Sequence, residues 1–417
     1  MESIPHLHPA ASGWLLDSQL ALYVDAYADH LKQGGYATAT IHEHMLCLVH
    51  LAQWMCRSGC DVSELDESAV DRFHNEHLPG CDCPEPVCRN RHALKATCSH
   101  LLRLLRDKGV IAGPATEDGP IEEELQGFDQ YMHCVRGLAE GTRRDRIRIV
   151  RRLLRACFAD QPVVISTLQP AHVRQFLATE LKRHDSISHA SALASALRAY
   201  FGFRTACGDR IGPLLGVIAS PAHWSLASLP GSLSEVEIER LLASFTPDLP
   251  SYRRGYAMVR CALDLGLRSC EIANLALADI DWQAGTVRLQ HTKSRREDLL
   301  PLPPTTGKAI AEYLRFERPA STNPAVFVRH MPPYDVPIGA DAVRKVIRVA
   351  YLRIGLTHGR THALRHTLAR HLVESGGSIK EVADVLRHRS LNTSLIYAKL
   401  DSRRLGAVAL PWPGSAT

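Results

Sequence analysis

The spacing of apolar residues constrains the fold of this chain more than any other feature of its sequence. From Leu20 to Trp54 they recur every three or four positions, as on one face of an α-helix, and the pattern is interrupted at Gly34 and Gly35. This predicts two helices joined by a turn. The same order of helix, glycine break and helix recurs around Gly137, which predicts a repeated helical unit. Further helices are predicted over residues 93–105, 128–135, 142–158 and 169–181.

The length of the chain bounds its domain count and class. Its 417 residues, of which 45% are hydrophobic and 22% charged, are typical of globular proteins. They suggest two or three domains at about 150 residues each. No apolar run approaches the roughly 20 residues that span a bilayer, and the N-terminus lacks the basic and then apolar layout of a signal peptide. We therefore expect a cytoplasmic protein with no membrane contact.

The net charge of +5 conceals an uneven distribution. Residues 1–118 hold 9 Lys and Arg against 16 Asp and Glu, a balance of −7, whereas the remainder holds 40 against 28, a balance of +12. A basic region favours a polyanion as its partner. We therefore expect a polyanion to contact the part of the chain after residue 118, and the acidic first part is a poor candidate for that contact.

A shift in composition marks a boundary between domains. Glycine, proline and small residues dominate residues 206–232, which indicates an interdomain linker. Ser234, followed three residues later by Glu237, then forms a capping box that predicts the start of a helix. The predicted organisation is an acidic helical domain over 1–118, a second helical domain over 119–205, the linker, a further domain over 233–404 and a tail over 405–417.

Arginines crowd one predicted helix of the second domain. Residues three and four apart share a helix face, so four of these arginines form a basic stripe beside the apolar positions. Such a row suits the phosphates of a DNA backbone, which supply affinity without sequence information. A solvated helix face is the other interpretation of the same row. The stripe consists of Arg144, Arg148, Arg151 and Arg155.

The domain predicted over 233–404 combines helices with a small β-sheet. Short strands are predicted over 286–289 and 299–302, and the polar stretch between them predicts a hairpin turn that carries Lys293. The chain as a whole is thus predicted to be mainly α-helical with a small β-sheet, with helical N-terminal domains and an α+β domain near the C-terminus.

Basic residues and one tyrosine follow in a fixed order along this domain. The segment "THALRHTLARHLVESG" places a histidine and an arginine three residues apart on one helix face, and nine residues separate a later histidine from the tyrosine. Single elements of this kind arise often by chance, whereas the ordered set is specific. In order and spacing the set resembles the catalytic residues of the tyrosine recombinase, or phage integrase, family: Arg268, Lys293, His362, Arg365, His388 and Tyr397. Residues 119–205 also resemble, by pattern and position, the family's SAM-like core-binding domain.

The resemblance implies phosphoryl transfer on a DNA backbone, without ATP, metal or another cofactor. Arg268 and Arg365 would clamp the non-bridging oxygens of the scissile phosphate, because a guanidinium offers a planar fork of donors and stays charged. Tyr397 would attack the phosphorus, which gives a 3′-phosphotyrosyl enzyme and frees a 5′-hydroxyl. The ester conserves the bond energy that rejoining requires.

The resemblance also implies roles in proton transfer. Lys293 would protonate the leaving 5′-oxygen, although Arg295 and Arg296 lie in the same turn and could hold the phosphate instead. His362 would assist proton transfer at the tyrosine, and His388 would donate a hydrogen bond to the phosphate.

Two neighbours of this set are expected to play supporting parts. Glu271 follows Arg268 by three residues and would support that arginine, as the acidic residue at this position does in the family. His366, adjacent to Arg365, is expected to be a structural histidine rather than a catalyst.

The stretch "HLPGCDCPEPVCRNRH" offers candidate metal ligands. Cys81, Cys83 and Cys88, with His77 or His92, could form a zinc set. Their spacing departs from the paired Cys-x2-Cys pattern of common zinc modules, which favours ordinary loop thiols. Both interpretations stay open at this point.

The partners follow from the resemblance. It implies double-stranded DNA as substrate and a homotetramer assembled across two DNA sites. The leading hypothesis is a site-specific recombinase or integrase of a mobile element. A type IB topoisomerase-like relaxing activity would use the same residues to reseal the original strand, and a DNA-binding accessory subunit or regulator with reduced catalysis is a further alternative. Residues 1–118 are expected to form an extension that contacts other proteins, such as a sister recombinase, or that encircles the DNA.

Overall fold

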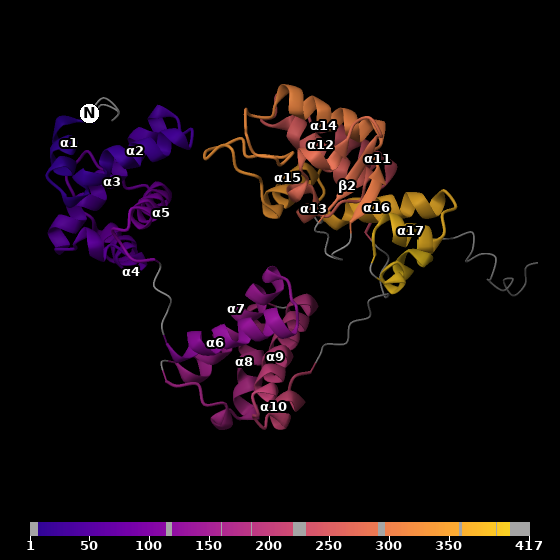
Figure 1. The fold of residues 1–417 in the computed structure, drawn as a ribbon, viewed down its shortest axis with the longest axis horizontal. Helices are drawn as coiled ribbons and strands as arrows, with labels where there is room; N and C mark the ends of the chain where they lie inside the picture. Colours follow the sequence, from indigo (N-terminus) through magenta and orange to yellow (C-terminus); the bar gives the residue numbers. More distant parts are fainter. Residues whose placement is uncertain are drawn as a thin grey trace, which may run out of the picture. The chain divides into compact units, whose positions relative to one another are not determined.

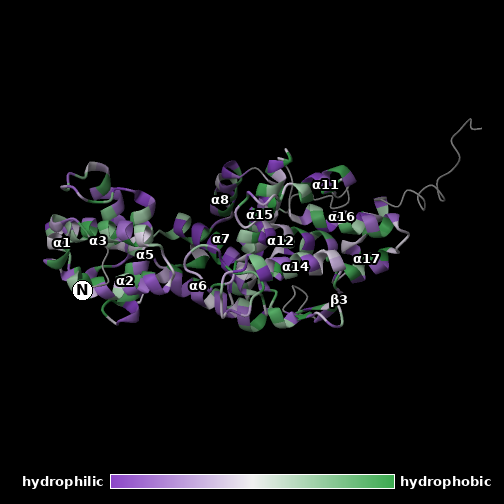
Figure 2. Ribbon diagram, turned by 90° about the horizontal axis from the view of Figure 1, so that it is seen from above, coloured by the Kyte–Doolittle hydropathy of each residue, from purple (hydrophilic) through white to green (hydrophobic). Residues whose placement is uncertain are grey.

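The structure, a computed structural model, describes residues 7–113, 119–159, 161–184, 186–219, 231–290, 297–357, 361–388 and 390–400. Within these ranges helices dominate and the strands form one small antiparallel sheet, which confirms the predicted fold class (Figure 1). Hydrophobic and hydrophilic residues alternate along the helices, as expected when one face of each is buried (Figure 2). None of the described helices is long and apolar enough to cross a membrane. Lys293 lies outside the described residues.

Residues 7–113 form helices around buried apolar side chains such as Leu48 and Leu101. The predicted break at Gly34 and Gly35 is confirmed, and Gly35 adopts a positive φ of 76° that favours glycine. The elements are α1 (Pro9–Leu16), η1 (Gln19–Tyr23), α2 (Val24–Gln33), α3 (Thr38–Ser58), η2 (Val62–Glu64), α4 (Glu67–Arg72), the π-helical turn η3 (Phe73–His77), η4 (Leu78–Gly80) and α5 (Arg91–Asp107).

Residues 119–219 form a second set of helices with a core of their own, which includes Phe128, Leu154 and Leu197. The predicted break at Gly137 is confirmed, with a φ of 57°. The elements are α6 (Pro120–Gln130), the π-helical turn η5 (Tyr131–Val135), α7 (Glu140–Phe158), η6 (Ile165–Thr167), α8 (Pro170–Arg183), α9 (Ile187–Ala206) and α10 (Gly212–Gly216).

Helix α10 falls inside the range predicted as a linker, 206–232. Its Leu214 and the following Ile218 are buried in the same core as α8 and α9. The composition of this range, rich in glycine and proline, is also that of a short helix bounded by turns. Residues 206–219 therefore belong to the helical core rather than to a linker.

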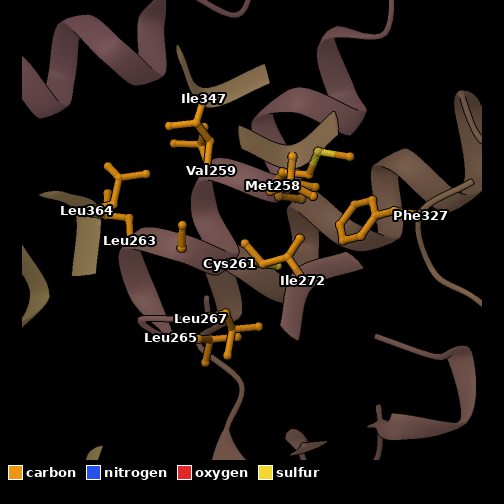
Figure 3. Close-up of a cluster of buried hydrophobic side chains, with 14 of the residues drawn as sticks. Met258, Val259, Cys261, Leu263, Leu265, Leu267, Ile272, Phe327, Ile347 and Leu364 are labelled. Carbon is orange, nitrogen blue, oxygen red and sulfur yellow. The ribbon is translucent and has the colours of Figure 1, made fainter. Parts of the chain in front are cut away.

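The C-terminal region, from residue 231, is built around α12. This helix contacts α13, α14, α15 and α16, and its Met258 and Val259 lie in a large buried cluster (Figure 3). The capping box of Ser234 and Glu237 is confirmed, because each side chain accepts a hydrogen bond from the other's backbone N–H. The helices are α11 (Glu235–Ala243), α12 (Tyr252–Asp264), α13 (Ser269–Asn274), η7 (Leu277–Asp279), α14 (Pro304–Phe316), α15 (Ala340–Arg353), α16 (Thr361–Glu374), α17 (Ile379–Val385), η8 (Leu391–Thr393) and η9 (Leu395–Leu400).

The sheet has the order β1–β2–β3, with both pairs antiparallel. Its strands are β1 (Ile280–Asp281), β2 (Thr286–Leu289) and β3 (Asp298–Pro301), so β2 is confirmed as predicted and β3 begins one residue earlier than predicted. Val287 and Leu289 are buried while Arg288 between them is exposed, the alternation that a strand with one covered face requires.

Tyr397 lies in a short 3-10 helix, η9. It is anchored by packing, because the ring is buried with Val373, Val382 and Leu386 from α16 and α17. The chain therefore holds the tyrosine against α16 through side-chain contacts and not through the regularity of a long helix.

Gly266→Ala should destabilise the protein more than Gly285→Ala. Both glycines have a positive φ, 58° and 64°, so alanine at either site costs about 1 kcal/mol of backbone strain. Only at Gly266 would the added Cβ also meet side chains, those of Leu368 and Leu386 at 3.0 Å, which adds about 1–3 kcal/mol of overpacking. Thermal unfolding of both variants measures the difference, and equal midpoints would contradict it.

Candidate active site

Arg268 stands at the start of α13, where Glu271 fixes it twice. The Glu271 carboxylate accepts a hydrogen bond from the Arg268 backbone N–H at 2.8 Å, and its Oε1 lies 2.7 Å from Arg268 Nη1. The backbone bond satisfies an N–H that the first turn of a helix leaves without a partner. The supporting position expected for Glu271 is thus the one that the structure shows.

A further arginine, Arg387, which the sequence did not single out, completes this arrangement. Its Nη2 lies 2.7 Å from Glu271 Oε2, and both side chains are almost fully buried, 2% and 3% exposed. Arg387 has a φ of 54°, a left-handed conformation that is uncommon for a residue with a side chain. The bend turns the chain after α17 so that the guanidinium reaches back to α13.

Arg365 approaches the same place from α16. Its guanidinium donates hydrogen bonds to the backbone carbonyls of Gly266 and Leu386, and the residue is 5% exposed. Burial and, after it, the positive charges of Arg268 and Arg387 lower the pKa of Arg365 to about 9. The three guanidinium groups are therefore close enough to repel one another.

The charges of this cluster do not balance. Burial alone would raise the pKa of Glu271, but the charges of Arg387 and Arg268 outweigh it and hold that pKa below its usual value. Glu271 is therefore ionised, and its carboxylate stands among three guanidinium groups, while the charge of Asp298 also acts on Arg387. The remaining excess of positive charge in a largely buried place suits an anion, above all one with several oxygens.

Tyr397 lies beside this cluster with a histidine at its hydroxyl. His366 Nδ1 is 2.8 Å from the Tyr397 hydroxyl oxygen, and the Tyr397 residue is 2% exposed. Burial raises the pKa of Tyr397, while the charge of Arg365 acts in the opposite direction. His366, expected to be structural, is thus in direct contact with the tyrosine. The His-x-x-Arg-His run was visible in the sequence, but nothing in it showed which histidine would face the tyrosine.

His388 contacts the tyrosine from another side. Its ring is parallel to that of Tyr397, with 6.3 Å between the centroids, and its Nδ1 lies 2.6 Å from Ser394 Oγ. Burial, together with nearby positive charges, lowers the pKa of both His388 and His366 to about 4. Both rings are therefore neutral at neutral pH, so a neutral His366 can accept a proton from the tyrosine hydroxyl.

Two residues of the predicted catalytic set remain, His362 and Lys293. His362 is exposed in the first turn of α16, and its charge acts on His366. Lys293 lies outside the described residues, between β2 and β3, which pair with Leu289 opposite Asp298. The structure thus brings together Arg268, Arg365, His388 and Tyr397 of the predicted set, and adds Glu271, His366 and Arg387.

The four arginines of the predicted stripe lie on α7, and each has an acidic partner within the same helical region. The pairs are Arg144–Glu140, Arg148–Asp145, Arg151–Glu122 and Arg155–Glu122. The Arg144 and Arg148 side chains stay 75% and 67% exposed, whereas Arg151 is held by both carboxylate oxygens of its partner at 2.7 Å. The stripe therefore divides into an exposed part and a part that is tied to α6.

The cysteine-rich stretch forms a compact group in the N-terminal region. Cys81 and Cys83 lie together with His77, and the fourth member is His50 from α3. No sequence pattern pointed to His50, because it lies far from the others along the chain and within an apolar helix face.

Two candidates from the same stretch lie apart from this group. The Cys88 thiol lies beside that of Cys47, and only its backbone carbonyl faces the group, 2.7 Å from His50 Nδ1. His92 is exposed in the first turn of α5 and is not among the clustered ligands of the described residues.

The comparisons with known proteins agree with this geometry. The sequence profile described as the Phage integrase family matches residues 232–404. A tyrosine recombinase XerC of Corynebacterium efficiens is 26% identical over 285 residues, 68% of this chain and 88% of the relative. The fold is similar to that of the XerH site-specific recombinase bound to a palindromic difH substrate, with a TM-score of 0.54 at 18% identity over 72% of this chain and 99% of that one.

A second solved structure and a full-length relative complete the comparison. A lambda integrase fragment, a dimer bound to a COC′ core site, has a TM-score of 0.52 at 14% identity over 70% of this chain and 97% of that one. A putative integrase/recombinase of Sinorhizobium fredii, y4rA, is 31% identical over 406 residues, 96% of each chain. This chain therefore belongs to the phage integrase family and is a tyrosine-type site-specific recombinase, an enzyme that breaks and rejoins DNA.

Proposed function

We propose that this recombinase cleaves DNA through Tyr397, whose oxygen forms a bond to the scissile phosphorus while the bond to the 5′-oxygen breaks. The product is a 3′-phosphotyrosyl enzyme and a free 5′-hydroxyl, and attack by a 5′-hydroxyl of another strand reverses the step and rejoins the DNA. The observation that carries the proposal is the cluster next to this tyrosine, in which the three guanidinium groups outnumber the carboxylates that face them.

The cluster supports a division of labour among the arginines. Arg268 and Arg365 would hold the non-bridging oxygens of the phosphate, whose negative charge increases as phosphorus becomes five-coordinate. Arg387 is bound to Glu271 and would act through it, as a positioning residue that keeps the carboxylate where it orients Arg268.

Proton transfer is assigned by contact. His366 is the residue at the Tyr397 hydroxyl, so we assign to it the proton that the tyrosine loses on attack. His388 would donate to the phosphate from Nε2, since its Nδ1 faces Ser394. Lys293 would protonate the leaving 5′-oxygen, a role that rests on the family resemblance. His362 would assist proton transfer at the tyrosine, a role that also rests on the family resemblance.

The wider partners are proposed from charge and from relatives. The exposed Arg144 and Arg148 on α7 would contact the DNA backbone, and the relatives solved on DNA, XerH with difH and lambda integrase with a core site, support double-stranded DNA as substrate. We infer a homotetramer across two sites in the cytoplasm, with residues 1–118 in contact with other proteins.

Tyr397→Phe should abolish the covalent protein–DNA adduct and keep DNA binding, because the buried ring stays while its oxygen is lost. The adduct is measured on denaturing gels after incubation with duplex DNA that includes the ends of the element that encodes the protein. Tyr256→Phe, which removes a hydroxyl elsewhere in the same domain, should form the adduct normally. An adduct at wild-type level in Tyr397→Phe would refute the proposal.

His366→Phe should slow adduct formation by about 100-fold, because it removes the proton acceptor and keeps an aromatic ring in the same place. The rate is measured in single-turnover cleavage of a nicked substrate that traps the adduct. His362→Phe on the same helix is the matched comparison and should slow cleavage less. If His362→Phe slowed cleavage more than His366→Phe, His362 would be the residue that accepts the tyrosine proton.

Glu271→Gln should lower the free energy of unfolding by about 3 kcal/mol, because it leaves the buried guanidinium of Arg387 without its carboxylate. Arg387→Met should lower it by less, because the Glu271 carboxylate keeps Arg268 as a partner. The double variant should lose less than the sum of the two, with a coupling of about 1–3 kcal/mol. Urea unfolding of the wild type, the two single variants and the double variant measures these free energies. If the two single effects simply add in the double variant, the ion pair contributes nothing to stability. Each single variant should also cleave DNA more slowly, since Arg268 loses its support.

A further inference from the structure

We propose that His50, His77, Cys81 and Cys83 bind a structural zinc ion in the N-terminal region. The ligand atoms of these four residues all lie within 4.8 Å of one another. Two sulfurs and two imidazole nitrogens are a donor set that favours zinc, and four protein ligands close a tetrahedral site without a position for water. The site is remote in sequence from the catalytic residues and has no part in the cleavage step.

The distances fit a tetrahedral centre. With Zn–N bonds of about 2.0–2.1 Å and Zn–S bonds of about 2.3 Å, neighbouring ligands lie about 3.3 Å apart for two nitrogens and about 3.6 Å apart for nitrogen and sulfur. The two Nε2 atoms of His50 and His77 are 3.2 Å apart. His50 Nε2 is 3.1 Å from Cys81 Sγ, and His77 Nε2 is 3.5 Å from Cys83 Sγ.

Hydrogen bonds outside the four ligands orient them for a cation. His50 Nδ1 lies 2.7 Å from the backbone carbonyl of Cys88, which can only accept, so the proton of the neutral ring is on Nδ1 and the lone pair of Nε2 faces the cluster. The Cys83 backbone N–H points to Cys81 Sγ at 3.4 Å, a bond that favours a thiolate. Cys88 thus acts through its carbonyl and not as the ligand that the sequence suggested.

Hydrogen bonds among the four side chains do not by themselves account for their close approach. His77 Nε2 and Cys81 Sγ both lie within 3.2 Å of the single lone pair on His50 Nε2, which can accept only one of them. His50 is fully buried and Cys83 is 2% exposed, so two of the four side chains are closed to water, whereas His77 and Cys81 are partly buried. Zinc bound to two thiolates and two neutral imidazoles has no net charge, which suits burial, and its binding releases the two thiol protons.

The backbone around the ligands is built to present them. His77 ends the π-helical turn η3, a rare element that occurs mostly at functional sites, and Phe73 of the same turn stacks on its ring at 5.5 Å. Asp82, between the two cysteines, pairs with Arg57 of α3 at 2.6 Å. The ion would therefore fasten the loop after η3 to α3, in a stretch with few apolar residues of its own.

Metal analysis of the full-length protein tests the proposal. Purified from zinc-replete cells, the wild type should hold about one zinc per chain, and Cys83→Ser and His50→Asn should hold less than about a tenth. Cys88→Ser and His92→Asn, from the same stretch, are the matched controls and should keep the metal. Wild-type protein with less than about a tenth of an equivalent, or zinc that is lost in the controls and kept in Cys83→Ser, would overturn the proposal.

A second measurement uses the wild-type protein, so its result does not depend on whether the variants fold. Wild-type protein reconstituted with Co²⁺ should show the intense visible bands of a tetrahedral ion and the charge-transfer band of a cobalt–thiolate bond. Zinc should displace both, and a chelator should lower the midpoint of thermal unfolding. A spectrum of octahedral cobalt without the thiolate band would refute the four-ligand site. Cleavage by Tyr397 does not enter either readout, so the outcome is independent of the proposed mechanism.

Discussion

The buried carboxylate of Glu271 is the interaction on which the catalytic region depends. It binds the backbone and side chain of Arg268 at the start of α13 and the guanidinium of Arg387 after α17. Two segments that are more than 100 residues apart in sequence are thereby fixed to one charged group. A buried charge that loses its partner costs free energy. Movement of either arginine away from Glu271 is therefore unfavourable, because it would leave a buried charge less well paired. The geometry of the site is thus maintained by electrostatics as much as by packing.

The same cluster is left with more positive than negative charge, and this is informative about its substrate. Burial, together with the charges of Arg268 and Arg387, lowers the pKa of Arg365 to about 9, so the protein by itself favours the charged form of this arginine less than water does. A phosphate diester would supply the missing negative charge and raise that pKa again. Substrate binding should therefore stabilise the folded domain, since the ligand binds the folded site and not the unfolded chain.

The sequence predicted what depends on local pattern. Apolar spacing located the helices around Gly34–Gly35 and Gly137, and the order of basic residues indicated the family. Contacts between distant segments could not be read in this way. The left-handed backbone of Arg387, the choice of His366 over His362 at Tyr397, and the arrival of His50 beside Cys81 all depend on tertiary packing.

The N-terminal group of histidines and cysteines and the arginine cluster beside Tyr397 are both largely buried, and they differ in whether the protein balances their charges. With zinc, the N-terminal group would have four ligands for one cation and no net charge, so it offers nothing to a substrate. The cluster beside Tyr397 keeps an excess of positive charge. A site whose charges are already balanced stabilises a fold, whereas a site with an excess of one charge binds a ligand of the opposite charge.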